Sequence, residues 1–482
     1  MTAWETQKHM KRLIFCFDGT WNTLDAPNPT NVVILAESIT PVGRSEVPQI
    51  IHYDPGVGTG RDDKWKGGLF GEGLIDKIVD AYTFLIFNYD IGDEIFVFGF
   101  SRGAFTARAF VGFIRQVGII QRKSAAAITE AVKLYEKRQP GQDNNRDDLL
   151  NFRQRASPEI CVDQAEDAWR VENCPGYVAG SGSVLRIKYL GVWDTVGAIG
   201  VPSDIFFAPF ANRHERYFDS DLSELVVSAR HAVSIDEDRN TFTPTLWSNF
   251  VDLNASLGYA HASSDAPYQQ KWFPGDHGSV GGGGDIRGLS DRALQWVLDG
   301  AIAMGLEVDK DPLSPLFALA PDDLAPLKNM RPAPSSLLGR SEAELLHHAP
   351  REEGPTRLED VSDGAIVRWR QPPDNLPERK SYRPAPLSGV AEALDASPSG
   401  SIAKPQSAVV STTMNAKPVA GNYYKIVYSD ALRGIALQAY GHADREDIIL
   451  AANPTITDPN RIYVGQVVYL PPVPRSENVT PL

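Results

Sequence analysis

Residues 94–105 read Glu-Ile-Phe-Val-Phe-Gly-Phe-Ser-Arg-Gly-Ala-Phe, and this stretch decides the fold. The apolar run at 94–100 predicts a buried strand, and a helical pattern over residues 103–117 follows it directly. The turn between them, Gly99-Phe100-Ser101-Arg102-Gly103, matches the pattern G-x-S-x-G. Such a turn bends the chain so tightly around the serine that the flanking positions need glycine to avoid clashes.

This context predicts that Ser101 is a nucleophile. The turn presents the Ser101 hydroxyl at the N-terminus of a helix, where backbone N–H groups favour developing negative charge. The alternative interpretation is a strand–helix turn that contains a serine with no catalytic role. We favour the nucleophile because the pattern has a buried strand before it and a helix after it, as the chemistry requires.

Other segments repeat the alternation of strands and helices. Apolar runs predict buried strands at residues 12–17 and 185–193. Residues 74–89 and 289–304 carry apolar side chains at helical spacing, with Ser290 as the expected N-cap of the second helix. This alternation predicts an α/β fold with a mostly parallel, α/β-hydrolase-like sheet covered by helices.

The sequence predicts three parts. Residues 10–310 carry the alternating pattern and form the expected catalytic domain. Residues 311–420 are rich in Pro, Ser, Ala and charge and form an extension and linker, with 390–420 as its flexible part. The section from 311 to 390 either packs on the core or is partly disordered. Residues 421–472 predict a small β-α-α-β module at the C-terminal end.

Composition and charge exclude several classes of function. The 482 residues carry a net charge of −14, whereas binding to a phosphate backbone needs clustered Lys and Arg, so we expect no nucleic-acid partner. The cysteines, Cys16, Cys161 and Cys174, are odd in number and form no C-x-x-C pair, which predicts neither a disulfide scaffold nor a thiolate zinc site. No H-E-x-x-H motif occurs, and we expect no metal and no cofactor.

The first twelve residues predict a cytoplasmic start. They include Glu5, Lys8 and His9 and contain no apolar h-region, so they do not resemble a Sec signal peptide. No run of about 18 uninterrupted apolar residues occurs, so we expect no membrane-spanning helix. Export of this protein would then need a machine other than the Sec route.

A nucleophilic serine needs a base, and the chain has nine histidines. In this fold class the order along the chain is serine, acid, histidine. His277 lies in a glycine-rich loop after a strand-like segment, which suits a base that is mobile yet placed. A loop histidine held by backbone contacts is the alternative role for His277. The rival base is His231, whose neighbours look helical and predict a structural role.

Asp194 is the expected acid. It directly follows the strand predicted at 185–193, and residues that leave the carboxyl end of a strand face the crevice where ligands bind. Two groups of acidic residues stay open as alternatives, one on a turn with Arg239 and one flanking His277. They are Asp236, Glu237 and Asp238 in the first group, and Asp276 and Asp285 in the second.

Attack of the serine on an ester would place a negative charge on the carbonyl oxygen, the oxyanion. A second loop is expected to supply backbone N–H groups that stabilise this charge. The segment Phe17-Asp18-Gly19-Thr20-Trp21-Asn22 follows the first strand, and Gly19 allows a close backbone approach. The predicted oxyanion and binding residues are therefore Asp18, Gly19, Thr20 and Arg102. Asp18 also permits a rival interpretation as the nucleophile of a haloacid-dehalogenase-like phosphatase. That chemistry needs D-x-D-x-T, and one of the two aspartates is missing here.

Five motifs in a fixed order resemble one known family. They are residues 17–22, 53–58, 99–104, 191–197 and 272–277. This part of the chain resembles the α/β-hydrolase domain of type VI secretion lipase effectors. The resemblance implies lipase or phospholipase activity, a triad of Ser101, Asp194 and His277, and the secretion machinery as a partner. The segment after the histidine departs from the family, which has His-Ser-Asp-Val-Gly-Gly-Gly where this chain has His277-Gly278-Ser279-Val280-Gly281-Gly282-Gly283 and so lacks the aspartate.

The C-terminal module resembles a LysM module. The resemblance rests on residues 423–427, 451–454 and 464–471. It implies binding to glycans that contain N-acetylglucosamine, such as peptidoglycan. The alternative is a degenerate module that serves protein contacts or solubility, because fold alone does not prove function.

Two functions from different classes follow. The first is a serine hydrolase of carboxylic esters, phospholipase-like or lipase-like, which works through an acyl-enzyme on a lipid or other ester. The second is a catalytically decayed hydrolase that acts as a peptidoglycan-binding or secretion-associated protein. Reaction of Ser101 with a fluorophosphonate distinguishes the two, because only a working site activates the serine.

Overall fold

The computed structural model divides into two compact units. The first comprises residues 1–308 and 320–402, and the second comprises residues 309–319 and 403–482. The structure describes residues 10–19, 26, 28–56, 70–137, 145–197, 221–239, 242–260, 263, 265–309, 314–328, 351, 353–396, 418, 422–425, 432–453, 456 and 467–472. The three-part division predicted from the sequence, with boundaries at residues 310 and 420, stays a prediction.

The first unit is built on a parallel sheet of six strands in the order β2-β1-β3-β6-β7-β8. The strands are β1 (Arg12–Phe17), β2 (Gln49–Asp54), β3 (Glu94–Phe100), β6 (Tyr189–Trp193), β7 (Ala229–Ser234) and β8 (Tyr268–Phe273). All residues of β1 and β6 are buried, as expected for apolar runs in a sheet that is covered on both faces. The predicted α/β fold is thus confirmed.

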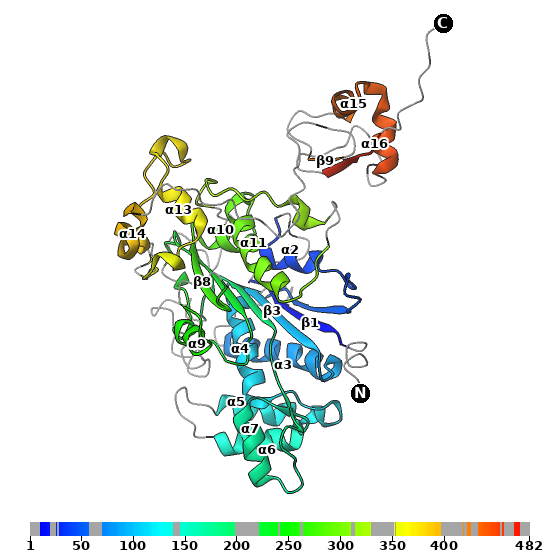
Figure 1. Cartoon of the computed structure of the whole chain (residues 1–482), viewed down its shortest axis with the longest axis vertical. Helices are drawn as coiled ribbons and strands as arrows, with labels where there is room; N and C mark the ends of the chain where they lie inside the picture. The colour runs from blue at the N-terminus through cyan, green and yellow to red at the C-terminus, as the bar shows by residue number, and fades with distance from the viewer. Residues whose placement is uncertain are drawn as a thin grey trace, which may run out of the picture. The chain divides into compact units, whose positions relative to one another are not determined.

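Helices cover both faces of this sheet (Figure 1). The layers are formed by α3 (Phe70–Asn88), α4 (Arg102–Val117) and α9 (Phe250–Ser256) on one face, and by α2 (Asn31–Ser38) and α11 (Gly288–Ala303) on the other. The first face buries a continuous apolar core in which Phe15 of β1 packs against Phe110 of α4, with ring centroids 4.7 Å apart. Every strand therefore ends at the same edge of a rigid, two-sided core.

A helical insertion separates α4 from β6. It contains η1 (Arg122–Ala127), α5 (Ile128–Glu136), α6 (Arg146–Ala156), β4 (Ile160–Cys161), α7 (Gln164–Asn173) and β5 (Ser183–Val184). Glu166 is buried between two arginines and lies 2.9 Å from Arg153 and 2.6 Å from Arg170. A buried charge needs such partners, so this ion-pair group fixes how the insertion folds.

Residues 320–328 and 353–396, which we call the flank, pack against the last strand of the sheet. The flank contains η5 (Leu358–Asp360), α13 (Asp363–Trp369), η6 (Pro373–Asn375), η7 (Ala385–Val390) and α14 (Ala391–Ala396). Val361 forms a parallel bridge with Trp272 of β8, and both side chains belong to a core shared by β7, β8 and the flank. Of the two alternatives for residues 311–390, packing on the core holds for these described residues.

The second unit is a small β-α-α-β module. It contains η4 (Pro315–Ala318), β9 (Asn422–Lys425), α15 (Leu432–Tyr440), η8 (Ala443–Arg445), α16 (Glu446–Ala452) and β10 (Val467–Leu470). Its two strands pair antiparallel, and Ile435, Ile449 and Val468 form its buried centre. The Asn453 amide bonds to both backbone groups of Tyr469, which joins the end of α16 to β10. The predicted order of strands and helices in this module is confirmed.

Some local predictions are wrong. The strand predicted at 185–193 begins only at Tyr189, and α11 has Arg287 rather than Ser290 as its N-cap. His231, expected on a helix, lies in the centre of strand β7. Among the helices that the structure describes, none is both long and apolar enough to cross a membrane.

Candidate active site

The turn between β3 and α4 places Ser101 at the carboxyl edge of the sheet. Ser101 is the N-cap residue of α4. Its backbone has φ 60° and ψ −126°, a conformation that residues other than glycine rarely adopt. A Cβ atom at Gly99 would lie 2.5 Å from the Gly103 carbonyl oxygen, and one at Gly103 would lie 2.2 Å from that of Phe17. Both flanking positions therefore require glycine, as the sequence pattern predicts.

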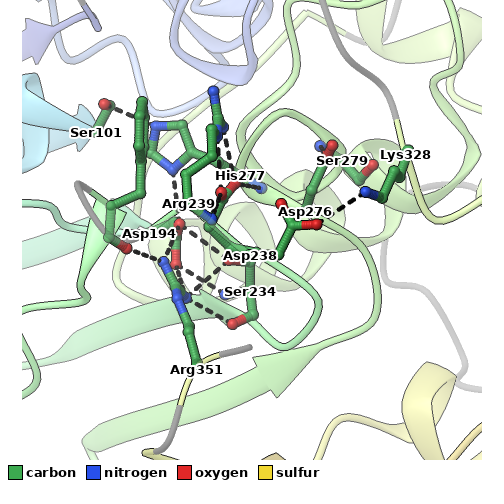
Figure 2. Close-up of polar contacts among 12 residues, drawn as sticks. Ser101, Asp194, Ser234, Asp238, Arg239, Asp276, His277, Ser279, Lys328 and Arg351 are labelled. Atoms are coloured by element: carbon green, nitrogen blue, oxygen red, sulfur yellow. Dashed lines mark hydrogen bonds and ion pairs between the residues drawn. The ribbon is translucent and has the colours of Figure 1, made fainter. Parts of the chain in front are cut away.

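The structure brings the three predicted triad residues into one hydrogen-bonded line (Figure 2). Ser101 Oγ lies 2.7 Å from His277 Nε2, and His277 Nδ1 lies 2.6 Å from Asp194 Oδ2. These pairs are 176 and 83 positions apart in the sequence. The order of bonds is the one in which an imidazole can take a proton from the serine and share its charge with the carboxylate.

Asp194 lies just beyond β6 and is completely buried. Its carboxylate accepts hydrogen bonds from the Ser234 N–H at 2.8 Å and from the Ser234 hydroxyl at 3.0 Å. Burial alone would raise the pKa of Asp194, but the charge of Arg351 and the hydrogen bond with His277 hold it well below its ordinary value. The group is therefore ionised and able to stabilise a positive imidazolium.

His277 is the first residue of the short helix α10 (His277–Gly281), not part of a loop as predicted. Asp276 caps this helix and accepts a hydrogen bond from the Ser279 N–H at 2.8 Å. The His277 ring lies 4.6 Å from the ring of Phe100 and 4.8 Å from that of Phe242. Two aromatic contacts and a helix start thus restrict the imidazole to the orientation that faces both partners.

The alternative acids have other partners. Glu237 pairs with Arg239 at 2.7 Å and accepts the backbone N–H of His277, and Asp238 pairs with Lys328 at 3.0 Å. Asp236 accepts hydrogen bonds from the Gly275 N–H at 2.7 Å and the Tyr382 hydroxyl at 2.8 Å. Glu237 and Asp236 thus fix the backbone at the start of α10, whereas Asp194 contacts the His277 ring.

Asp236 makes the stability of the folded protein depend on pH, and replacing its carboxyl group with the amide of asparagine would remove this dependence. Burial raises the pKa of Asp236 to about 6, although its hydrogen-bond donors and Arg368 oppose this. Because the folded value exceeds the unfolded one, Asp236 contributes stability below about pH 4 and loses it as pH rises through about 6. Asparagine keeps an acceptor for both donors and cannot ionise.

We therefore expect Asp236→Asn to stabilise the protein by about 1–2 kcal/mol at pH 8, since water at its partly exposed side chain reduces the full effect. Below pH 4 the gain should vanish. Urea unfolding from pH 4 to 8 measures it, with Asp238→Asn as the control, because the Asp238–Lys328 pair is largely exposed. A gain that does not change with pH would contradict this explanation.

Of the oxyanion residues predicted after β1, the structure describes Asp18 and Gly19. The Gly19 N–H donates to the Asp18 carboxylate at 2.6 Å, so in this conformation it is directed at its neighbour. Asp18 also accepts hydrogen bonds from the Thr30 hydroxyl at 2.8 Å and the Tyr53 hydroxyl at 2.9 Å. Thr20 lies outside the described residues. Three donors on Asp18 indicate a residue that shapes the loop after β1.

Arg102, the other predicted oxyanion residue, is the first residue of α4 and follows the serine directly. Backbone N–H groups in the first turn of a helix have no partner within the helix, so this position suits an oxyanion. Burial lowers the pKa of the Arg102 side chain to about 10. The oxyanion role of this position stays a prediction.

His231, the rival base, contacts the residue after Asp194 instead. Its Nε2 accepts the Thr195 N–H at 3.2 Å, and its Nδ1 lies 2.9 Å from Gln270 Oε1. Burial lowers the pKa of His231 to about 3, so the ring is neutral. By accepting the Thr195 N–H, His231 stabilises the backbone just after β6. In the parts of the chain that the structure describes, no cluster of three His, Cys, Asp or Glu residues could hold a metal ion.

Sequence reasoning missed Arg351, whose guanidinium bonds to both oxygens of Asp194 at 2.9 and 3.0 Å. It lies in a stretch without helical or strand periodicity, beyond the predicted catalytic domain. No local signal in the sequence separates it from the arginines around it.

Comparisons with known proteins identify one matching family and one curated relative. The family model described as "T6SS, Phospholipase effector Tle1-like, catalytic domain" matches residues 11–300, more than half of the chain. A curated relative, the uncharacterized protein YEL023C of Saccharomyces cerevisiae, is 28% identical over 247 residues, which are 48% of this chain and 32% of that protein. The chain therefore spans about a third of the length of this relative.

Two solved structures are also similar. An uncharacterized protein from Pseudomonas aeruginosa shows 20% identity and a TM-score of 0.32, with 62% of this chain and 46% of that chain covered. The structure of the Tle1 effector bound to the VgrG spike from the Type 6 secretion system shows 19% identity and a TM-score of 0.30, with 56% and 51% covered.

Proposed function

The chain belongs to the Tle1-like phospholipase effector family of the type VI secretion system, and from this premise we propose that it hydrolyses carboxylic esters of lipids with Ser101, His277 and Asp194. Family membership supports a lipase-like or phospholipase-like hydrolase. The observation that carries the residue roles is the hydrogen-bonded line from Ser101 Oγ through the His277 ring to Asp194.

The proposed reaction has two halves. His277 Nε2 takes the proton of Ser101 as Oγ bonds to the ester carbonyl carbon, and Asp194 stabilises the imidazolium that forms. The carbon–oxygen bond to the leaving alcohol then breaks, and the alcohol receives the proton from Nε2. Water attacks the acyl-enzyme with its proton taken by His277, and the fatty acid leaves as Oγ regains a proton.

We propose the type VI secretion machinery as a partner, because the matching family is described as one of phospholipase effectors of this system. Export by this route needs no Sec signal peptide. We further propose that residues 421–472 act as a separate LysM-like module that binds a glycan containing N-acetylglucosamine. Its compact β-α-α-β core supports an independently folded binding unit.

The test combines a covalent probe with a lipid panel. We expect a fluorophosphonate to label the chain at Ser101, located by mass spectrometry of its peptides, and Asp194→Asn to slow the labelling about 1,000-fold or more. Phospholipid vesicles that differ in head group, and soluble p-nitrophenyl esters, are then compared for release of fatty acid or nitrophenol. A wild-type chain that is neither labelled nor active would favour the decayed hydrolase.

A further inference from the structure

Arg351 is a buried cation on the side of Asp194 away from the histidine (Figure 2). Its Nη1 lies 2.9 Å from Asp194 Oδ1 and its Nη2 lies 3.0 Å from Asp194 Oδ2, a bidentate contact that matches the planar fork of a guanidinium. Nη1 also bonds to the Ser234 carbonyl at 2.6 Å and hydroxyl at 2.8 Å, and Nη2 bonds to the Phe242 carbonyl at 2.6 Å. The guanidinium is therefore fixed by the last residue of β7 and by the Phe242 carbonyl.

This contact determines how the acid faces the base. Asp194 Oδ2 accepts from Arg351 and from His277, whereas Oδ1 accepts from Arg351 and from the Ser234 N–H. A carboxylate held at both oxygens cannot rotate about its Cβ–Cγ bond. The oxygen that faces His277 Nδ1 thus stays 2.6 Å from it.

The charge of Arg351 acts on the histidine as well. The charged groups around His277 are Asp194 on its ring, Glu237 on its N–H, Asp276 before it, and Arg239, which pairs with Glu237. Arg351 is the cation that balances Asp194. Arg351 and an imidazolium at His277 would therefore compete for the same carboxylate.

Arg351 comes from outside the family domain. It lies 157 positions after Asp194 and beyond the matched residues 11–300. The flank also holds the base, because the Leu327 carbonyl accepts the Asp276 N–H at 3.0 Å and the Ser279 hydroxyl at 2.9 Å. Segments after residue 300 thus contact both the acid and the helix that carries the base.

We propose that Arg351 is a positioning residue of the hydrolysis reaction, which fixes the Asp194 carboxylate toward His277 and places a competing positive charge beside this carboxylate. This inference rests on the proposed function. A purely structural arginine would affect folding and leave the pH dependence of the reaction unchanged.

The test compares Arg351→Met and Arg351→Lys with Arg357→Met, a matched control at an exposed arginine near the start of the flank. For each, kcat/KM for p-nitrophenyl butyrate and the rate of fluorophosphonate labelling are measured from pH 5 to 9. Rates are expressed per folded molecule, with the folded fraction from circular dichroism.

We expect Arg351→Met to lower the maximal rate about tenfold or more and to move the acid limb of both profiles up by about one pH unit. Arg351→Lys keeps the charge, so it should fold even if the methionine variant does not. Because one ammonium cannot hold both oxygens, its rate should fall about tenfold with the acid limb in place. Arg357→Met should match the wild type.

Either of two results would overturn the inference. One is a lysine variant with the wild-type rate, and the other is a folded methionine variant whose acid limb does not move. If the wild type itself fails to react with the phosphonate, the proposed function is refuted and the inference falls with it.

Discussion

Ser101→Ala should lower kcat/KM for ester hydrolysis by at least about 1,000-fold and leave the fold intact. The mutation removes the oxygen that lies 2.7 Å from His277 Nε2, and with it the atom that forms the acyl-enzyme. Alanine is smaller than serine and keeps the close approach of the backbone at this turn. Release of fatty acid from phospholipid vesicles and hydrolysis of a p-nitrophenyl ester measure the loss.

Ser256→Ala is the matched control, because Ser256 is exposed at the end of α9 and its hydroxyl bonds only locally, to the Leu253 carbonyl at 2.8 Å. It should retain full activity. Both variants should unfold in urea within about 1 kcal/mol of the wild type. Equal rates for Ser101→Ala and the wild type would remove Ser101 as the nucleophile.

Gly103→Ala should destabilise the protein by at least about 3 kcal/mol. A Cβ at this position would lie 2.2 Å from the carbonyl oxygen of Phe17 and 2.4 Å from that of Asp18. These are backbone atoms at the end of β1, which pairs with β2 and β3 on its two sides. The collision can be relieved only by moving α4 away from the sheet, which exposes the apolar core.

The same helix supplies the control. Among the described residues, a Cβ at Gly112 would meet the Tyr135 hydroxyl alone, at 3.5 Å, which is ordinary contact. Gly112→Ala should therefore leave stability unchanged or raise it by about 0.5–1 kcal/mol, the usual gain in a helix interior. Urea unfolding compares the two variants. If they unfold at the same urea concentration, the close packing of α4 on β1 is not what requires glycine at 103.

The sequence was most informative where a local pattern and a buried strand coincide. The strands at 12–17 and 94–100 were predictable because a strand covered on both faces is apolar throughout. The turn at Ser101 was predictable because both glycines that it requires lie within one stretch of five residues, 99–103. Asp194 and His277 could be named because each follows a strand that ends at the ligand-binding edge. Their catalytic roles stay predictions.

The errors come from contacts that no local pattern records. β7 was mistaken for a helix because His231 interrupts its apolar run, and this ring is satisfied by Gln270 from the neighbouring strand. No local pattern records that the side chain of Asp18 accepts the Gly19 N–H, and the oxyanion role of Gly19 stays a prediction. Arg351 meets Asp194 only after the chain has crossed the whole sheet, so spacing could not reveal it.

The separation of Asp194 from its guanidinium partner also sets an order of events during synthesis. A ribosome releases residue 194 long before residue 351, and a buried carboxylate without its cation is costly. We therefore expect Asp194 to settle into its final place only after residue 351 has left the ribosome. Before that step Asp194 would lack its cation, so the distance between residues 194 and 351 in the sequence delays completion of this ion pair.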